Sequence, residues 1–230
     1  MPEKNHRKLF EKTQRAYFMK VFLLSHIVAV FLIAQAPAVA QTVNGLDYNR
    51  VGIGYASGTL SGVRGRTALN GDASGVATQF QTLVAEKFVF GFGYENYTGN
   101  IEARLGGRTI SAGLRNNNTY LSLGYRVAIL EGADLVPRLM YLNSRANVGG
   151  ESADGRTTAY GLLLNTRVSE RAQATFGFKT DGKGNDYGRT YDAGLLFKAT
   201  QAIGLGINYS RNEVDSGNTK TWVFMVEYLF

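Results

Sequence analysis

The chain has 230 residues, a length that suits one β domain better than two. It contains no cysteine, which excludes disulfides, thiolate metal sites, cysteine nucleophiles and a lipid anchor on cysteine. The formal net charge is +7, and 28 glycines, 13 tyrosines and 13 phenylalanines against 3 prolines are typical of a strand-and-turn protein.

Residues 1–40 have the pattern of an export signal. Basic residues lead into an apolar run at 21–34, and Ala38-Val39-Ala40 is the small-x-small pattern that a signal peptidase cuts, leaving Gln41 first. The run is shorter than the roughly 20 residues that a spanning helix needs, although an uncleaved anchor is the alternative. Met19-Lys20 offers a second start, and one hypothesis is that residues 1–18 are not translated. Peptides from 1–18 in the unprocessed precursor would refute it.

The positive charge belongs largely to this signal. Removing residues 1–40 leaves 19 basic and 16 acidic residues, a net charge of +3. We therefore expect no nucleic-acid partner.

Beyond residue 40, period-2 alternation dominates and helical periodicity is nowhere convincing. Most of the predicted strands have the ~9–11 residues of a membrane-crossing strand. The alternation predicts ten of them, at 46–58, 75–85, 88–105, 108–130, 135–146, 157–168, 173–181, 188–199, 204–212 and 219–230.

The predicted connections alternate between short and long. Short ones fall at 86–87, 131–134, 169–172 and 200–203, and longer ones, rich in Gly, Asn, Asp and Ser, near 59–74, 98–116, 147–156, 182–187 and 213–218. Short turns on one side and long loops on the other are typical of outer-membrane barrels. An even strand count places both termini on the short-turn, periplasmic side.

The direction of the side chains gives a sharper test of a membrane barrel. In each predicted strand, the alternate positions that carry apolar residues are assigned to the outer face, and the remaining positions to the lumen. Nine glycines then face inward: Gly52, Gly54, Gly91, Gly93, Gly124, Gly161, Gly177, Gly194 and Gly206. Nine charges face the lumen: Arg50, Glu95, Arg126, Arg138, Arg167, Lys179, Asp192, Lys198 and Glu227. An outer aromatic girdle faces outward near the long-loop ends: Tyr55, Tyr94, Tyr141, Tyr160, Tyr191, Tyr209 and Trp222. Amphipathic rings at one level suit the headgroup region of a bilayer.

Phe88, Tyr125, Phe197 and Tyr228 form a weaker girdle at the other end. A charge facing lipid at mid-depth would cost about 2–4 kcal/mol, so the lack of such charges in the pattern supports a membrane barrel. A soluble β-sandwich is the alternative, but it would not require aromatics at one strand end. Pro137 is tolerable at a strand start. The predicted fold is all-β, a closed antiparallel transmembrane β-barrel of about ten strands, preceded by a signal peptide.

The last strand carries an aromatic pattern that ends at the C-terminus. Its outward residues are Trp222, Phe224, Val226, Tyr228 and Phe230. This pattern resembles the C-terminal signal of bacterial outer-membrane proteins, and the resemblance implies recognition by the barrel-assembly machinery. As a whole, the chain is similar to the small barrel superfamily of OmpA-, OmpX- and Opa-like proteins. Those barrels have eight strands, so the count of ten is nearer adhesins such as OpcA.

We predict no enzyme, cofactor or metal site. Enzymatic outer-membrane barrels, as families, rely on a histidine, but His6 and His26, the 2 histidines, both lie in the export segment. Glu95 and Asp192 could do acid/base work only if they were close. Residues 181–186 have oxygen ligands but lack the spacing of a calcium loop.

The inward charges leave two interpretations open. Five basic residues are predicted near the periplasmic end, with Glu227 at their level: Arg50, Arg126, Arg138, Arg167 and Lys198. Arg126 and Arg138 are predicted to lie opposite each other across the turn at Gly132, which is unfavourable unless countered. The interior is either filled by salt bridges or a weakly anion-selective passage.

Residues 101–112 are predicted to form a hairpin with a Gly106-Gly107 turn, pairing Ile101 with Ala112 and Ala103 with Ile110. The hairpin either packs on neighbouring loops or binds a partner above the membrane. We therefore predict a non-enzymatic barrel of the Gram-negative outer membrane with a structural or cell-surface interaction role; the alternative is a narrow porin for small solutes. The predicted partners are outer-membrane lipid and lipopolysaccharide, the barrel-assembly machinery and an extracellular ligand at the loops.

Overall fold

The computed structural model describes residues 42–64, 67–181 and 188–230. The predicted signal peptide and its cleavage residues, Ala38, Ala40 and Gln41, lie outside these residues. Within the described ranges, no helix is long and apolar enough to cross a membrane.

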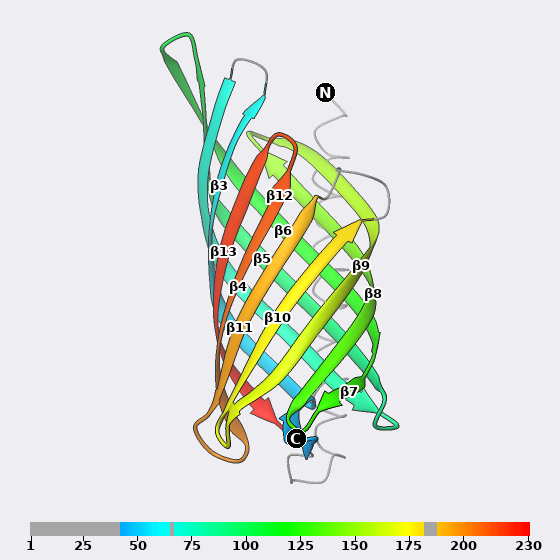
Figure 1. The fold of residues 1–230 in the computed structure, drawn as a ribbon. Helices are drawn as coiled ribbons and strands as arrows, with labels where there is room; N and C mark the ends of the chain where they lie inside the picture. The colour runs from blue at the N-terminus through cyan, green and yellow to red at the C-terminus, as the bar shows by residue number, and fades with distance from the viewer. Residues whose placement is uncertain (1–41, 65–66, 182–187) are drawn as a thin grey trace, which may run out of the picture. The chain divides into compact units, whose positions relative to one another are not determined.

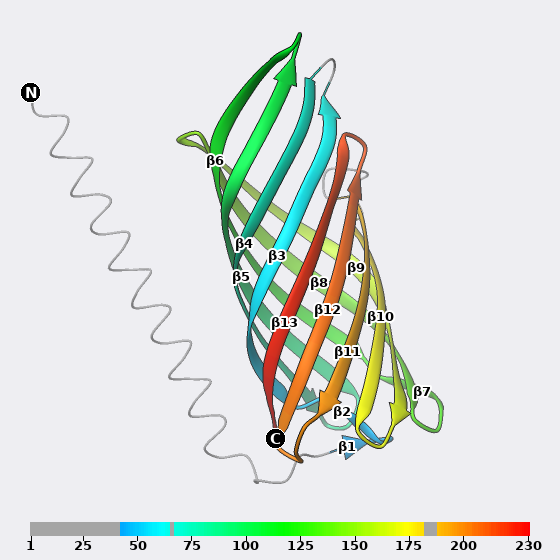
Figure 2. The ribbon, with the colours of Figure 1, turned by 90° about the vertical axis from the view of Figure 1, so that its left-hand side faces the viewer.

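Residues 50–229 form a closed antiparallel barrel (Figures 1 and 2). Its strands are β3 (Arg50–Arg64), β4 (Thr67–Val84), β5 (Phe88–Leu105), β6 (Arg108–Tyr125), β7 (Val127–Leu130), β8 (Ala133–Val148), β9 (Glu151–Ser169), β10 (Ala172–Asp181), β11 (Arg189–Lys198), β12 (Ile203–Val214) and β13 (Gly217–Leu229). Because β6 and β7 both pair with β8 and form one interrupted strand, the barrel has ten strands, as predicted. The barrel closes where β13 pairs with β3, for example Met225 with Gly54.

The long connections predicted from the sequence are mostly strand, which corrects that prediction. β5 and β6 stay paired out to Leu105 and Arg108, and β3 and β4 out to Arg64 and Thr67. Ladders of this kind pair backbone donors and acceptors even where the side chains are Asn, Ser and Gly, residues that otherwise favour loops. The predicted hairpin at 101–112 is confirmed in register, with positive φ at Gly106 and Gly107. Residues 182–187 lie outside the described ranges.

Pro137 lies inside β8 rather than at the start of a strand, and the sheet adapts to it. Proline has no N–H for the ladder, and the pairing of β8 with its neighbour is interrupted at this point, between Gly124 and Val127. On its other side, the strand stays paired past this point: the backbone N–H of Arg126 donates to the carbonyl of Lys87 at 2.6 Å, in register with the β5–β6 ladder. A closed barrel therefore accommodates proline by splitting one strand into β6 and β7.

The outer face of the barrel is apolar and exposed. Its large exposed side chains include Ile53, Val76, Phe90, Leu123, Leu139, Leu162, Phe176, Leu195, Leu205 and Phe224. In contrast, charged residues such as Asp134 and Glu227 are buried in the interior. This inversion of a soluble protein's arrangement excludes the β-sandwich alternative.

Glycines on the inner face give room to the long side chains of the lumen. A Cβ at Gly93 would overlap the ring of Tyr120, and one at Gly161 would meet Arg138 Nε at 3.0 Å. A Cβ at Gly52 would meet Glu227 Cγ at 2.9 Å. The glycine track therefore allows large side chains to fill a narrow barrel.

Candidate functional site

A short hairpin closes the short-turn end of the barrel, and we call residues 42–48 the plug. It consists of β1 (Thr42–Val43) and β2 (Leu46–Asp47), joined by Asn44 and Gly45 at φ 56° and 72°. Two central residues with positive φ make the tight hairpin turn that Asn-Gly favours. Figure 2 shows β1 and β2 at the end of the barrel where β13 finishes.

The plug packs through an apolar core and through hydrogen bonds. Leu46 and Tyr48, at 0% and 1% exposure, lie against Val89, Val136 and Leu163 from three different strands of the wall. The amide of Gln81 donates to the Tyr48 carbonyl at 3.3 Å. Such contacts to strands around the circumference fix the plug across the opening.

Asp134 is the centre of the polar contacts to the plug. Its carboxylate, fully buried, accepts from Asn44 Nδ2 and from the Tyr48 hydroxyl, both at 2.8 Å, and pairs with Arg126. Burial raises the pKa of the Tyr48 hydroxyl, so Tyr48 stays a donor. Because the folded pKa exceeds the unfolded one, this contribution to stability is lost only at strongly alkaline pH.

A second ion pair connects the plug with the wall. Asp47, 2% exposed, lies 2.8 Å from Lys198 Nζ, and its backbone N–H donates to Gln173 Oε1 at 3.0 Å. At the turn, a Cβ on Gly45 would meet Arg167 Nη1 at 2.5 Å, which places this arginine beside the plug. The Asp47–Lys198 pair thus connects the plug with β11, and Arg167 lies beside its turn.

Beyond the plug, a charged belt crosses the lumen. Arg50 pairs with Glu227 at 3.5 Å, and Asp192 pairs with both Arg138 and Lys179 at 3.4 Å and 3.5 Å. Asp192 also accepts from the Ser210 hydroxyl at 2.8 Å. These ion pairs and hydrogen bonds fill the interior with side chains.

Next to the belt lies a second apolar cluster. It consists of Ala56, Ala77, Tyr97, Val223 and Met225, all buried, from β3, β4, β5 and β13. Its position on the inner face follows from the register, since Met225 precedes Glu227 by one inward step of β13. The interior is therefore layered, with apolar packing on both sides of the charged belt.

The structure places each of the nine charges predicted for the lumen next to a partner. Glu95 accepts from Asn118 at 3.3 Å, and Arg167, exposed at the short-turn rim, pairs with Glu131 at 3.2 Å. The predicted facing of Arg126 and Arg138 is wrong: Arg138 pairs with Gly124 across the ladder. The hairpin turns at Glu131 and Gly132 and has a bulge between Ala128 and Leu130, which together shift the register by two residues from the predicted one. Glu227 forms an ion pair with Arg50, and Asp134 forms one with Arg126.

Glu95 and Asp192 have separate partners and form no carboxylate pair in any contact of the described residues. Sequence reasoning also missed Asp47 and Asp134, the two acids that hold the plug. Asn44-Gly45, between Val43 and Leu46, was the signal that could have revealed the hairpin.

The residues proposed for the outer girdle are on the outer face of the barrel. Tyr55, Tyr141, Tyr160, Tyr191 and Trp222 are exposed, while Tyr94 and Tyr209 are half-buried. Two tilted ring pairs involve these girdle residues. The ring of Tyr209 lies 4.7 Å from that of Trp222, and the ring of Tyr191 lies 5.5 Å from that of Phe178. At the other end, Phe88 and Tyr125 make an edge contact at 5.6 Å.

In the C-terminal strand, Trp222, Phe224 and Val226 are exposed and Tyr228 is half-buried. Phe230, predicted to face outward, is instead buried at 9% exposure and follows the end of β13 at Leu229. The described chain therefore begins and ends at the short-turn end, as predicted.

No protein-family model matches the chain, and no curated protein matches it. Solved structures do. The transport unit of the autotransporter AIDA-I from Escherichia coli matches with a TM-score of 0.51 at 10% identity, covering 83% of this chain and 93% of that one.

The translocator domain of the autotransporter NalP from Neisseria meningitidis matches at 0.48 and 13% identity, over 94% and 98% of the two chains. The outer membrane protein OprG from Pseudomonas aeruginosa matches at 0.44 and 12% identity, over 82% and 99%. At these identities the likeness concerns the fold alone. The chain has the fold of an outer-membrane β-barrel.

Proposed function

We propose that this chain is a closed, non-conducting barrel of the Gram-negative outer membrane, with a structural or cell-surface interaction role. The observation that carries the proposal is the interior: a docked plug at one end and a charged belt next to it. All nine charges predicted for the lumen have partners within the wall or the plug, with Asp192 shared between Arg138 and Lys179.

Export and membrane location are part of the same proposal. Residues 1–40 act as the signal peptide and residues 41–230 as the barrel domain, so the first residue of the protein isolated from membranes is Gln41; another first residue would contradict this. The exposed apolar face supports insertion into lipid and lipopolysaccharide. The aromatic C-terminus resembles the signal read by the barrel-assembly machinery, and a Phe230→Ser variant that still inserts at the normal rate would refute that role.

The membrane barrel is tested by its behaviour on an SDS gel. We expect an unboiled sample to run at a different position from a boiled one, because the closed ladder of ten strands resists the detergent until it is heated. Identical positions for the two samples would argue against a stable barrel. A shift that disappears when the protein is first unfolded in urea would show that the shift reports the fold.

A narrow, weakly anion-selective passage is the second candidate. It is favoured by the excess of basic side chains near the short-turn end, including Arg50, Arg126 and Lys198. Conduction would require that the plug leave the opening and that the belt rearrange. The closed interior therefore favours the first candidate.

The surface role is assigned to the β5–β6 hairpin, which extends beyond the neighbouring strands in Figures 1 and 2. Ile110 and Leu105 near its tip are 67% and 54% exposed. Exposed apolar side chains on a rigid, paired hairpin form a surface that a partner can cover. This arrangement supports a binding site for an extracellular ligand.

Replacing residues 100–112 with a short turn is expected to abolish surface binding and to leave the barrel folded, because β5 and β6 remain paired below Asn100. Adhesion of cells that carry the variant measures binding, and the heat shift on the gel measures folding. Replacing residues 147–152 of the β8–β9 hairpin with a short turn is the matched control. Normal adhesion by the 100–112 variant would exclude this hairpin as the binding surface.

The role is non-enzymatic in this proposal. The sequence has no histidine beyond the export segment, and the buried carboxylates of Asp134 and Glu227 are held in ion pairs. Chemical alteration of lipid A or phospholipid by the purified barrel would overturn it.

A further inference from the structure

Three basic side chains gather on the outer face of the barrel, just beyond the aromatic girdle. Arg211 lies one outward step past Tyr209 on β12, and Lys220 one outward step past Trp222 on β13, toward the hairpin ends. Arg189 lies one outward step past Tyr191 on β11. All three residues are exposed. If the girdle marks the headgroup level, these cations reach the level of lipid phosphates.

The register brings like charges together. Arg211 and Lys220 are direct partners across the β12–β13 ladder. Like charges in this position repel each other unless an anion counters them. Glu213 lies directly across from Arg189 in the β11–β12 ladder but pairs with Arg211 at 2.7 Å. Among the described residues, neither Arg189 nor Lys220 forms an ion pair. The set therefore has three positive charges and one negative charge.

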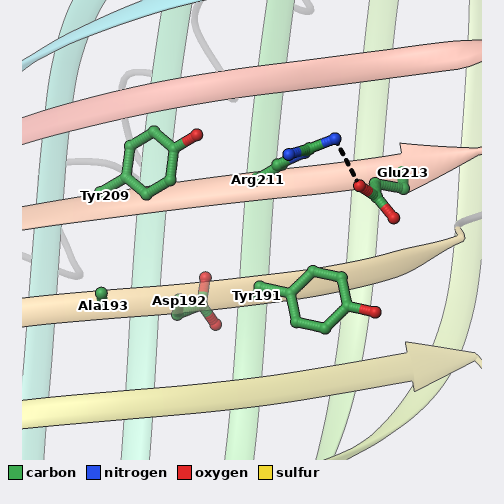
Figure 3. A pocket seen from close by; sticks show the side chains of 6 residues that line it. All are labelled: Tyr191, Asp192, Ala193, Tyr209, Arg211 and Glu213. Atoms are coloured by element: carbon green, nitrogen blue, oxygen red, sulfur yellow. Dashed lines mark ion pairs between the residues drawn. The ribbon is translucent and has the colours of Figure 1, made fainter.

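A groove lies beside this set. Its volume is about 370 Å³, and it is lined by Tyr191, Asp192, Ala193, Tyr209, Arg211 and Glu213. Figure 3 shows the Tyr191 and Tyr209 rings on neighbouring strands, with the small side chain of Ala193 directly across from Tyr209. Two aromatic walls and a small apolar floor suit the portion of a lipid next to its headgroup.

We propose that this face of β11–β13 binds the phosphate headgroup of an anionic membrane lipid. Arg189, Arg211 and Lys220 hold the phosphate, and the groove between Tyr191 and Tyr209 takes the adjoining part of the lipid. The guanidinium of Arg211 can donate two parallel hydrogen bonds to phosphate oxygens, and the phosphate relieves its repulsion with Lys220. The site rests on the proposed function in one respect, since the barrel must lie in a bilayer.

Trp222 provides an intrinsic fluorescence probe of this site. It is the 1 tryptophan of the sequence, and its ring lies 4.7 Å from that of Tyr209. The purified protein is placed in phosphatidylcholine nanodiscs that contain a small fraction of spin-labelled lipid. Spin-labelled phosphatidic acid is expected to quench Trp222 fluorescence more strongly than equally labelled phosphatidylcholine. The ratio of the two quenching constants gives the preference for the anionic headgroup.

The double variant Arg189→Gln/Lys220→Gln removes two charges and leaves the Arg211–Glu213 pair in place. Each basic residue near the membrane surface contributes about fivefold, so the preference is expected to fall about 30-fold. The matched control, Arg104→Gln/Arg145→Gln, removes the same charge from arginines that have their own acids at 3.7 Å and 3.2 Å, and is expected to keep the preference. Both variants are first checked for the heat shift on the gel.

The outcomes separate this site from membrane insertion. Quenching by neither labelled lipid would refute insertion, and the site with it. Equal quenching by both lipids, or an equal loss of preference in the two double variants, would overturn the site alone. Inorganic phosphate is also added to nanodiscs of pure phosphatidylcholine at matched ionic strength. A change in Trp222 emission would then show that the site binds a free anion, and would contradict the proposal of a lipid headgroup.

Discussion

Asp134→Ala is expected to lower the free energy of unfolding in detergent micelles by about 3–5 kcal/mol, because it removes one partner of a buried ion pair. Asp134 is 0% exposed and Arg126, its partner, has a side chain that is 12% exposed. The variant also leaves the Tyr48 hydroxyl and the Asn44 amide without their common acceptor. Urea titration followed by tyrosine fluorescence or circular dichroism measures the change.

Asp154→Ala is the matched control for this prediction. Asp154 pairs with Arg145 at 3.2 Å, but both side chains are more than half exposed. Removal of an exposed partner should cost only about 0–1 kcal/mol. Equal effects of the two variants would mean that Asp134 is not a buried centre of the plug contacts.

Leu46→Ala is expected to release the plug while the barrel stays closed. Truncating a fully buried leucine costs about 2–5 kcal/mol, because the transfer energy is lost and a cavity remains. The open population of the plug should therefore rise about 30-fold or more. Hydrogen exchange of the backbone amides at residues 43–48 measures this opening, since the plug can open as a local unit.

Leu105→Ala provides the control with the same chemical change. Leu105 is 54% exposed at the tip of the β5–β6 hairpin and touches no part of the plug core. It should leave amide exchange in the plug unchanged. Unaltered exchange in the Leu46 variant would show that the apolar contacts do not hold the plug in place.

Much of the barrel could be predicted from the sequence because its signals are local. Alternation predicts a strand by itself, and the parity of Phe224 and Val226 assigns the face of β13 without knowledge of its neighbours. The register of 101–112 follows from the Gly106-Gly107 turn, since a two-residue turn determines which residues pair. The closing pair β3–β13 follows from an even strand count.

The plug was missed although the sequence carries signals for it. Apolar residues change parity between Tyr48 and Val51, but the prediction merged the hairpin with β3 and assigned 46–58 to one strand. Whether a segment continues a strand or folds back depends on contacts with Val136 and Leu163, which lie far along the chain. Strand parity also places Asp47 outward, whereas the separate hairpin buries it against Lys198.

The partners of the inward charges were hidden for a related reason. Parity identifies which side chains point into a barrel, but the ion pairs join residues far apart in sequence, such as Arg50 and Glu227. A small change at a turn is enough to alter the pairing: the turn at Glu131–Gly132 and the bulge beside it place Arg138 across from Gly124, and Arg126 pairs with Asp134. Sequence patterns therefore predict the face of a residue better than its contacts.

The most direct test of the closed interior is the conductance of a planar bilayer that contains refolded residues 41–230. We predict no reproducible single-channel steps. A variant that lacks residues 42–48 and carries Arg50→Ser and Glu227→Ser, which removes the plug and one ion pair of the belt, should conduct and so prove that insertion occurs. Reproducible steps from the unaltered barrel, with a reversal potential toward that of the anion, would contradict the closed interior and establish the narrow anion-selective passage instead.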